Sequence, residues 1–152
     1  SNAATFLIMV NKYCKLNLSK DDLCKIAVKI GADVPFFVYE YDSANVTGIG
    51  EIVEKFDEEI LNIETVTPNI KCNTGEIFKI FREKFYKQIS KEEANKLLSM
   101  KSVDILKHFG IEDANDLYKS ALSLYPQLGD YEKKDWFFSG SGSSFFRINN
   151  GK

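Results

Sequence analysis

The apolar positions at the start of the chain recur with the period of an α-helix. Three- and four-residue spacings predict one helix within residues 1 to about 16. A second stripe follows Ser19 and Asp22, whose spacing is that of a capping box. The apolar positions of the two stripes are Phe6, Leu7, Val10, Tyr13 and Cys14, then Leu23, Ile26, Ala27 and Ile30. The pattern therefore predicts two helices joined by a short turn, with Gly31 at the C′ position of the second.

Aromatic and β-branched residues replace this helical spacing after Pro35. Residues 36–39 read Phe-Phe-Val-Tyr and residues 44–47 read Ala-Asn-Val-Thr, and both segments flank a polar turn at residues 40–43. Short aromatic and β-branched runs around a polar turn are typical of paired strands. We therefore expect a β-hairpin here.

The acidic residues 57–59 separate two parts of the chain with different patterns. Directly after them, residues 63–67 alternate between apolar and polar positions and stop at Pro68, which cannot donate a hydrogen bond to a sheet. This segment predicts a strand. We expect a domain boundary at the acidic stretch, with one domain at residues 1–60 and a second at residues 61–152.

Helical spacing dominates the middle of the second part. Thr74 is placed to cap a first helix, and Ser90 with Glu93 forms another capping box. Residues 113–124 predict a further helix, which ends near Pro126. We expect the core of this part to include Ile77, Phe78, Phe81, Phe137 and Phe145.

Two aromatic segments follow the helical part of the pattern. Residues 136–138 and 144–148 predict strands, and a turn of glycine and serine joins them at residues 139–144. One strand, several helices and two further strands in this order predict an α+β sandwich.

The composition excludes several classes of partner. A chain of 152 residues that is 44% apolar and 28% charged can bury one sizeable core or two small ones. Its formal net charge of −2 is too balanced to indicate a nucleic-acid or membrane-surface partner. No apolar run approaches the roughly 20 residues of a spanning helix. We expect a cytoplasmic protein without a nucleic-acid or membrane partner.

The metal-binding and nucleophilic residue types are sparse. Cys14, Cys24 and Cys72 are widely spaced, and His108 is the only histidine. These residues predict free buried thiols in a reducing cytosol, no metal site and no dyad of histidine with cysteine or serine. His108 ends a short apolar helical stretch, where a surface or capping role is the usual one.

Asp33 is the carboxylate with the most restricted setting. It follows Gly31 and precedes Pro35, so we expect it on a short rigid corner between a helix and a strand. One interpretation is a turn aspartate that bonds its own backbone. The other is a catalytic carboxylate that orients a hydroxyl group and accepts its proton late in phosphoryl transfer.

Two glycine-rich segments offer backbone amides to an anion. Residues 139–144 read Ser-Gly-Ser-Gly-Ser-Ser, so amides and hydroxyls are both accessible there, although an ordinary hairpin turn has the same composition. Residues 48–51 read Gly-Ile-Gly-Glu. They lack the ending of a P-loop and the strand-to-helix setting of a dinucleotide fingerprint, so they predict a phosphate loop only weakly.

The order of these segments resembles the GHMP small-molecule kinases. The resemblance rests on Gly-Ala-Asp-Val-Pro-Phe-Phe at residues 31–37, Gly-Ile-Gly-Glu at 48–51, Asn-Asp-Leu at 115–117 and Ser-Gly-Ser-Gly-Ser at 139–143. Thr67-Pro68, Thr74 and Tyr125-Pro126 also follow the family order. Ser1-Asn2-Ala3-Ala4 looks like the tail of the family's phosphate loop, although Ser-Asn-Ala is also a common cloning scar.

The resemblance implies a fold, a reaction and a set of site residues. It implies the end of a GHMP kinase N-terminal, ATP-binding domain followed by a ferredoxin-like α/β sandwich. The implied reaction is ATP-dependent phosphorylation of the 2-hydroxyl of 4-diphosphocytidyl-2-C-methyl-D-erythritol, with Mg²⁺, in non-mevalonate isoprenoid biosynthesis. The resemblance assigns catalysis to Asp33, ATP or phosphate binding to Ser1, Asn2, Gly140, Ser141 and Gly142, and substrate binding to Thr74 and Ser139.

Alternatives stay open at this point. Another GHMP kinase, acting on homoserine or a mevalonate derivative, is the nearest one, and a non-catalytic ligand-binding or subunit-interaction domain is the other. The family's catalytic lysine and most of its phosphate loop would precede Ser1. We therefore expect a C-terminal fragment that is inactive alone and that shows either self-association or high mobility around residues 1–60.

Overall fold

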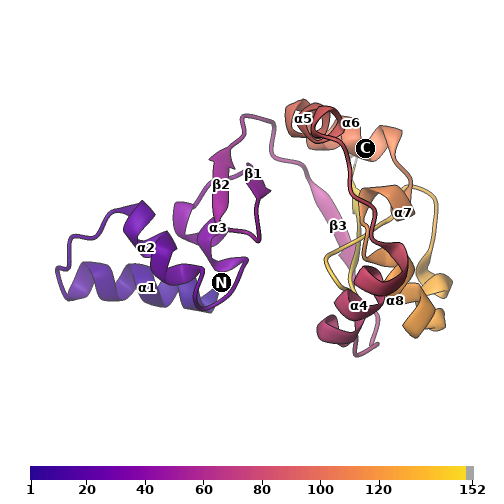
Figure 1. Ribbon diagram of the computed structural model, residues 1–152, viewed down its shortest axis with the longest axis horizontal. Helices are drawn as coiled ribbons and strands as arrows, with labels where there is room; N and C mark the ends of the chain where they lie inside the picture. The colour runs from indigo at the N-terminus through magenta and orange to yellow at the C-terminus, as the bar shows by residue number, and fades with distance from the viewer. Residues whose placement is uncertain (150–152) are drawn as a thin grey trace. The chain divides into compact units, whose positions relative to one another are not determined.

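The computed structural model describes residues 1–149 (Figure 1). The chain forms two compact units, Ser1–Ile60 and Leu61–Lys152. Both contain helices and antiparallel strands, so the predicted α+β class is confirmed. Residues 150–152 of the predicted second domain lie outside the described part of the chain.

The first unit combines helices with a two-stranded antiparallel sheet. Its elements are α1 (Asn2–Tyr13), α2 (Lys20–Ala27), α3 (Val34–Tyr39), β1 (Ala44–Thr47) and β2 (Ile52–Lys55). The two predicted helices are confirmed, and Ser19 caps α2 by accepting a hydrogen bond from the Asp22 amide at 3.1 Å. Gly31 is not the C′ residue, because α2 already ends at Ala27. The Gly31 amide instead donates to the Ala27 carbonyl across a turn, at 3.1 Å.

The segment predicted as the first hairpin strand is the helix α3. Pro35 lies in the first turn of this helix, where its fixed φ is favourable and its missing amide hydrogen is not needed. Val34 and Val38 are buried, so this apolar run follows the helical period instead of the two-residue period of a strand. A hairpin does form, but between β1 and β2, with Thr47 opposite Ile52.

The turn of this hairpin contacts the backbone that leads into α3. Gly50 has a φ of 118°, and a side chain there would collide with the carbonyl oxygen of Ala32. The Glu51 carboxylate stabilises the turn by accepting a hydrogen bond from the Ile49 amide at 2.7 Å. The turn can approach Ala32 only because residue 50 has no side chain.

The core of the first unit is small and leaves large apolar side chains outside it. Its buried members come from the three helices and are Ala4, Leu23, Cys24, Ala27, Val34 and Val38. Phe6 and Tyr13, predicted on the buried face of α1, are 67% and 74% exposed. The predicted core positions Ile26 and Ile30 of the second stripe are also exposed, at 40% and 57%. Helix α1 is therefore apolar on a face that this unit does not cover.

The second unit is a three-stranded antiparallel sheet with helices. Its strands are β3 (Ile63–Val66), β4 (Phe137–Phe138) and β5 (Phe145–Ile148), in the order β3-β5-β4. Its helices are α4 (Thr74–Ile80), a π-helical turn (Phe81–Phe85), α5 (Lys91–Ser99), α6 (Ser102–His108), α7 (Ile111–Ala114), α8 (Tyr118–Leu124) and a 3₁₀-helix (Pro126–Tyr131). The three predicted strands of this part are confirmed.

Helices α4 and α8, the 3₁₀-helix and the strands β4 and β5 supply the core of the second unit. Its fully buried members are Ile77, Tyr118, Ala121, Leu128, Phe138 and Phe145. Ile77, Phe137 and Phe145 are buried as predicted. Phe78 is 41% exposed, so its prediction as a core residue is wrong. It adjoins Ile77 in sequence, and neighbours on a helix face different directions.

The helix caps and helix limits predicted for this unit were only partly correct. Ser90 and Glu93 form the predicted reciprocal capping box of α5. Asn73, not Thr74, caps α4, because its side-chain oxygen accepts from the Glu76 amide at 3.3 Å. The helix predicted at residues 113–124 is interrupted, because Asn115 has extended backbone angles between α7 and α8.

The structure shows the environment of the three cysteines and of His108. Cys14, Cys24 and Cys72 are free thiols, and Cys24 is buried and Cys72 half-buried. The prediction of burial is wrong for Cys14, which is exposed. His108 is exposed in the last turn of α6, where its Nδ1 lies 2.7 Å from the Asp104 carbonyl oxygen, in agreement with the capping prediction. Within residues 1–149, no helix is long and apolar enough to cross a membrane.

The contact between Gly50 and Ala32 leads to a stability prediction. We predict that Gly50→Ala lowers the free energy of opening the first unit by about 2 kcal/mol, because the new methyl group collides with backbone at a strained φ. Native-state hydrogen exchange of the Leu23 and Val38 amides would then be roughly 30-fold faster. Gly31→Ala is the matched control, since its methyl group would meet only Val34 at an ordinary 3.5 Å. Equal exchange in the two variants would contradict the account.

The uncovered face of α1 leads to a prediction about association. We predict that the 152-residue chain self-associates through its first unit, because Phe6 and Tyr13 expose apolar area that a second copy can cover. Sedimentation velocity should show mass that increases with concentration, and Phe6→Ser with Tyr13→Ser should reduce it. Tyr86→Ser, at an exposed aromatic of the second unit, is the control. A monomer at every concentration would refute the prediction.

Candidate functional site

Asp33 lies at the corner between α2 and α3. It is the N-cap residue of α3, with φ −84° and ψ −11°, and its side chain is exposed. The corner joins two helices, not the predicted helix and strand, because residues 34–39 are helical. The carboxylate makes no capping hydrogen bond to α3. The backbone-bonded turn aspartate is therefore not the conformation present, and the carboxylate is available to a ligand.

The backbone before Asp33 is held from the side by the β1–β2 turn. Gly50 contacts the Ala32 carbonyl there, one residue before the carboxylate. The sequence marked residues 48–51 only as a weak phosphate loop and missed this packing role. The signal in the sequence was the pair of glycines at positions 48 and 50. Both have positive φ in the structure, and glycine allows a close approach of backbone to backbone.

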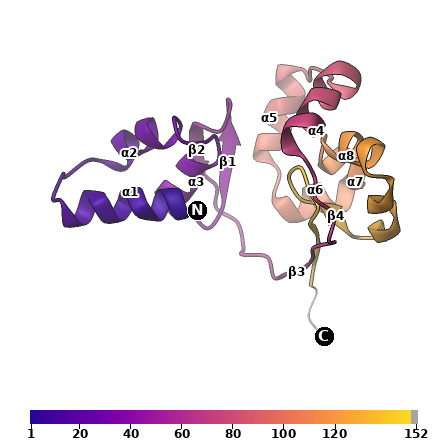
Figure 2. The same cartoon turned by 90° about the horizontal axis from the view of Figure 1, so that it is seen from below.

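Ser1 and Asn2 lie at the N-terminal end of α1. Ser1 is the N-cap residue and its side chain makes no capping bond. Ala4, in the first turn, belongs to the same core cluster as Val34, the residue after Asp33. Figures 1 and 2 both show the N-terminal end of α1 beside α3. The amides at the start of a helix and its dipole favour an anion at this position.

The glycine-serine segment of the second unit is a tight turn between β4 and β5. The Ser139 amide donates to the Ser144 carbonyl at 2.9 Å, and the Gly142 amide donates to the Ser139 carbonyl at 3.0 Å. Gly140 and Gly142 have φ of 55° and 93°. A side chain on Gly142 would collide with the Phe138 ring. Glycine is therefore required at position 142 by both conformation and space.

Hydroxyl groups fix this turn to the start of the second unit. The Thr74 and Ser141 hydroxyl oxygens lie 2.7 Å apart, and those of Thr67 and Ser144 lie 2.8 Å apart. The buried Ser143 hydroxyl donates to the Pro68 carbonyl at 2.7 Å. The structure therefore brings together Thr74 and the turn residues that the sequence predicted as site residues.

The Gly140 and Ser141 amides are among those of the turn that are left for a ligand. Within residues 1–149, the backbone amides of Gly140 and Ser141 donate no hydrogen bond. Gly140 is exposed, and a left-handed glycine beside a further free amide is typical of a concave anion site. This part of the turn is therefore suited to phosphate oxygens.

The cysteine nearest the turn is not a nucleophile. A Cβ placed on Gly142 would lie 3.1 Å from Cys72 Sγ, so the thiol packs against the turn. Burial raises the pKa of the Cys72 thiol, and burial also raises that of Cys24. Both thiols therefore stay protonated at neutral pH.

The sequence also missed Asn115 as a contact of this turn. Its side-chain amide donates to the carbonyls of Phe138 and Gly140, each at 2.9 Å. The signal was the Asn-Asp-Leu segment, in which an asparagine two residues before Leu117 can form a local side-chain turn.

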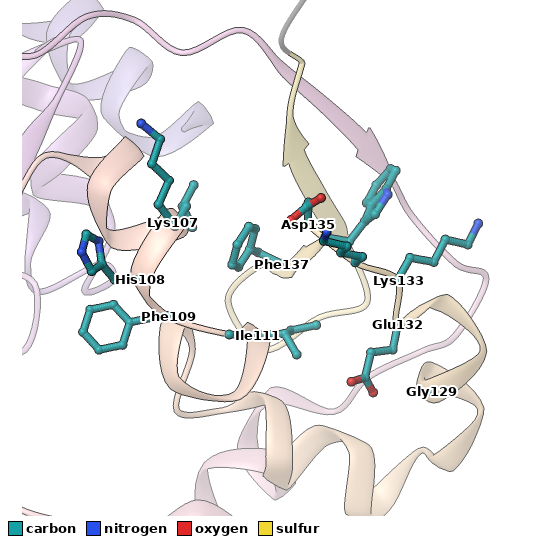
Figure 3. A pocket seen from close by; sticks show the side chains of 13 residues that line it. Lys107, His108, Phe109, Ile111, Gly129, Glu132, Lys133, Asp135 and Phe137 are labelled. Carbon is teal, nitrogen blue, oxygen red and sulfur yellow. The ribbon is translucent and has the colours of Figure 1, made fainter.

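A cavity of about 630 Å³ lies elsewhere in the second unit, between α6 and the loop before β4 (Figure 3). Ile111 and Phe137 extend into its middle, whereas Lys107 and Lys133 extend to opposite sides. None of the predicted site residues lines it. The candidate site residues therefore form two separate groups, the Asp33 corner in the first unit and the turn in the second, and neither group lines this cavity.

Comparison with known proteins identifies relatives along nearly the whole chain. The family model described as GHMP kinases N terminal domain matches residues 1–41. The 4-diphosphocytidyl-2-C-methyl-D-erythritol kinase of Sulfurimonas denitrificans is 47% identical over 97% of this chain and 56% of its own length. The proteins of the same name from Sulfurovum sp. and Helicobacter pylori are 43% and 36% identical. This chain spans 58% and 56% of their lengths, so it matches little more than half of each relative.

A solved structure shows the same fold. The crystal structure of a 4-(cytidine 5'-diphospho)-2C-methyl-D-erythritol kinase superposes on 97% of this chain and 54% of its own chain, with a TM-score of 0.64 at 22% identity. The GHMP kinase fold implied by the sequence resemblance is thereby confirmed. The chain is thus similar to GHMP kinases along nearly its whole length and shares their fold.

Proposed function

We propose that the protein containing this chain transfers the γ-phosphoryl group of ATP to the 2-hydroxyl of 4-diphosphocytidyl-2-C-methyl-D-erythritol, a step of non-mevalonate isoprenoid biosynthesis. The names of relatives that are 36% to 47% identical support this reaction. One structural observation supports it most directly. The exposed Asp33 carboxylate makes no capping bond and lies within the segment that the family model matches.

The division of the chain follows from the same proposal. Residues 1–60 would be the end of the N-terminal, ATP-binding domain, and residues 61–152 the C-terminal domain. The match of the N-terminal family model ends at residue 41, inside the first compact unit, which supports this assignment.

Asp33 would act as the proton acceptor. Its carboxylate orients the 2-hydroxyl and takes up its proton as the bond from that oxygen to the γ-phosphorus forms and the bond to the ADP oxygen breaks. A carboxylate suits this role because the transition state is loose and the proton moves late. The packing of Gly50 on Ala32 supports the role, because it restrains the corner that carries the carboxylate.

Backbone amides would bind the phosphate groups. The free amides of Gly140 and Ser141 and the glycine at 142 fit phosphate oxygens, and Ser1 and Asn2 at the start of α1 offer a second set of donors. The Thr74 and Ser139 hydroxyls would contact the substrate. Mg²⁺ bound with ATP supplies charge neutralisation between the phosphates.

A substitution of Asp33 tests the proposal. We predict that Asp33→Asn in the full-length enzyme lowers kcat by roughly 10²-fold or more, because the amide cannot accept the proton, while the KM for ATP changes little. Coupled assays of ADP release measure both constants. Asp57→Asn is the matched control, since that carboxylate is exposed in an ion pair with Lys55 at 3.0 Å. Near-normal turnover of Asp33→Asn would contradict the proposal and would indicate that Asp33 has only a structural role.

A further inference from the structure

The side chain of Asn115 makes three hydrogen bonds, and two of them join the chain between α7 and α8 to the end of β4 and the glycine-serine turn. Its Nδ2 group donates to the Phe138 carbonyl and to the Gly140 carbonyl, each at 2.9 Å. Its Oδ1 accepts from the Leu117 amide, also at 2.9 Å. The side chain is half-buried and all its amide hydrogens and one acceptor site are used. Both donated bonds go to carbonyls on either side of Ser139.

The bond to the Gly140 carbonyl sets the direction of the next amide. In a planar trans peptide the carbonyl and the N–H point in opposite directions. Because the Gly140 carbonyl points toward Asn115, the Ser141 N–H points away from it. That N–H makes no hydrogen bond within residues 1–149.

The other hydrogen bonds of the turn do not involve the carbonyl or the N–H of this peptide group, although the bond from the Gly142 amide to the Ser139 carbonyl closes the turn around it. The hydroxyls of Thr74, Ser143 and Ser144 hold side chains or later residues of the turn. Gly140 has no Cβ to restrict its rotation, and a side chain there would meet nothing within 4 Å. Without Asn115 the Gly140–Ser141 peptide can therefore rotate while the rest of the turn stays in place.

We propose that Asn115 is a positioning residue that holds the Ser141 amide toward a phosphate group of the bound reactants. The proposal rests on the proposed kinase function and adds a residue to it. The bound phosphate belongs either to ATP or to the diphosphate of the substrate, and both present the same phosphate oxygens to a backbone amide. Asn115 itself touches neither reactant.

Asn115→Asp separates positioning from local structure. The carboxylate keeps an oxygen that accepts from the Leu117 amide, so the start of α8 is preserved. It cannot donate to the Phe138 and Gly140 carbonyls, so the peptide group is released. Asn95→Asp is the matched control, because it makes the same chemical change at an exposed position of α5.

Kinetics of the full-length enzyme give the first test. We expect Asn115→Asp to raise one KM by roughly tenfold, with a smaller change in kcat, as expected for one misdirected hydrogen bond to a charged group. A rise in the KM for ATP assigns the amide to the nucleotide, and a rise in the KM for the diphosphocytidyl substrate assigns it to the substrate. Unchanged KM values for both, in a variant that folds, would overturn the proposal while leaving the kinase function intact.

Binding of inorganic pyrophosphate to the 152-residue chain gives a second test that does not depend on the variant's activity. In nuclear magnetic resonance spectra, the Ser141 amide signal of the wild-type chain should shift on titration, and the shift should be lost in Asn115→Asp but kept in Asn95→Asp. No shift in the wild-type chain would overturn the proposal even if Asn115→Asp failed to fold. Loss of the proposed function would appear separately, as a wild-type enzyme that does not phosphorylate the substrate.

Discussion

The contact between Gly142 and the Phe138 ring decides whether the β4–β5 turn can form. Phe138 is buried in the core of the second unit, so its ring cannot move aside for a side chain at position 142. With glycine there, the turn folds over the ring, the Ser143 hydroxyl reaches the Pro68 carbonyl, and Ser141 meets Thr74. The free amides of the turn are therefore carried by a segment that packs on the core of that unit, which is what a preorganised phosphate site requires.

In the first unit a glycine also allows a close packing contact, here beside the residue that carries the Asp33 carboxylate. Gly50 has no side chain, so the β1–β2 turn packs on Ala32 and restrains the corner before Asp33. In both units a glycine with positive φ brings a turn against a fixed neighbour. The group with a proposed role is Asp33, next to Ala32, in the first unit and the Ser141 amide, next to Gly142, in the second. The glycines thus matter to the proposed function through close packing as well as through the phosphate contacts of the Gly140 amide.

Local chemistry allowed much of the fold to be predicted from the sequence. The caps at Ser19 and Ser90 and the three strands of the second unit depend on neighbouring residues, and all were correct. Residues 36–39 were assigned wrongly because four apolar residues do not distinguish a helical period from a strand period. Asn115 was missed as an anchor because its carbonyl partners lie 23 and 25 residues away, where no local pattern shows them.

A structure of the full-length protein with a non-hydrolysable ATP analogue and the diphosphocytidyl substrate tests the central claim most directly. The account predicts that the Asp33 carboxylate lies within about 3.2 Å of the 2-hydroxyl and that the Ser141 amide donates to a phosphate oxygen. An Asp33 carboxylate turned away from the hydroxyl, with a different group in hydrogen-bonding contact with it, would contradict the account.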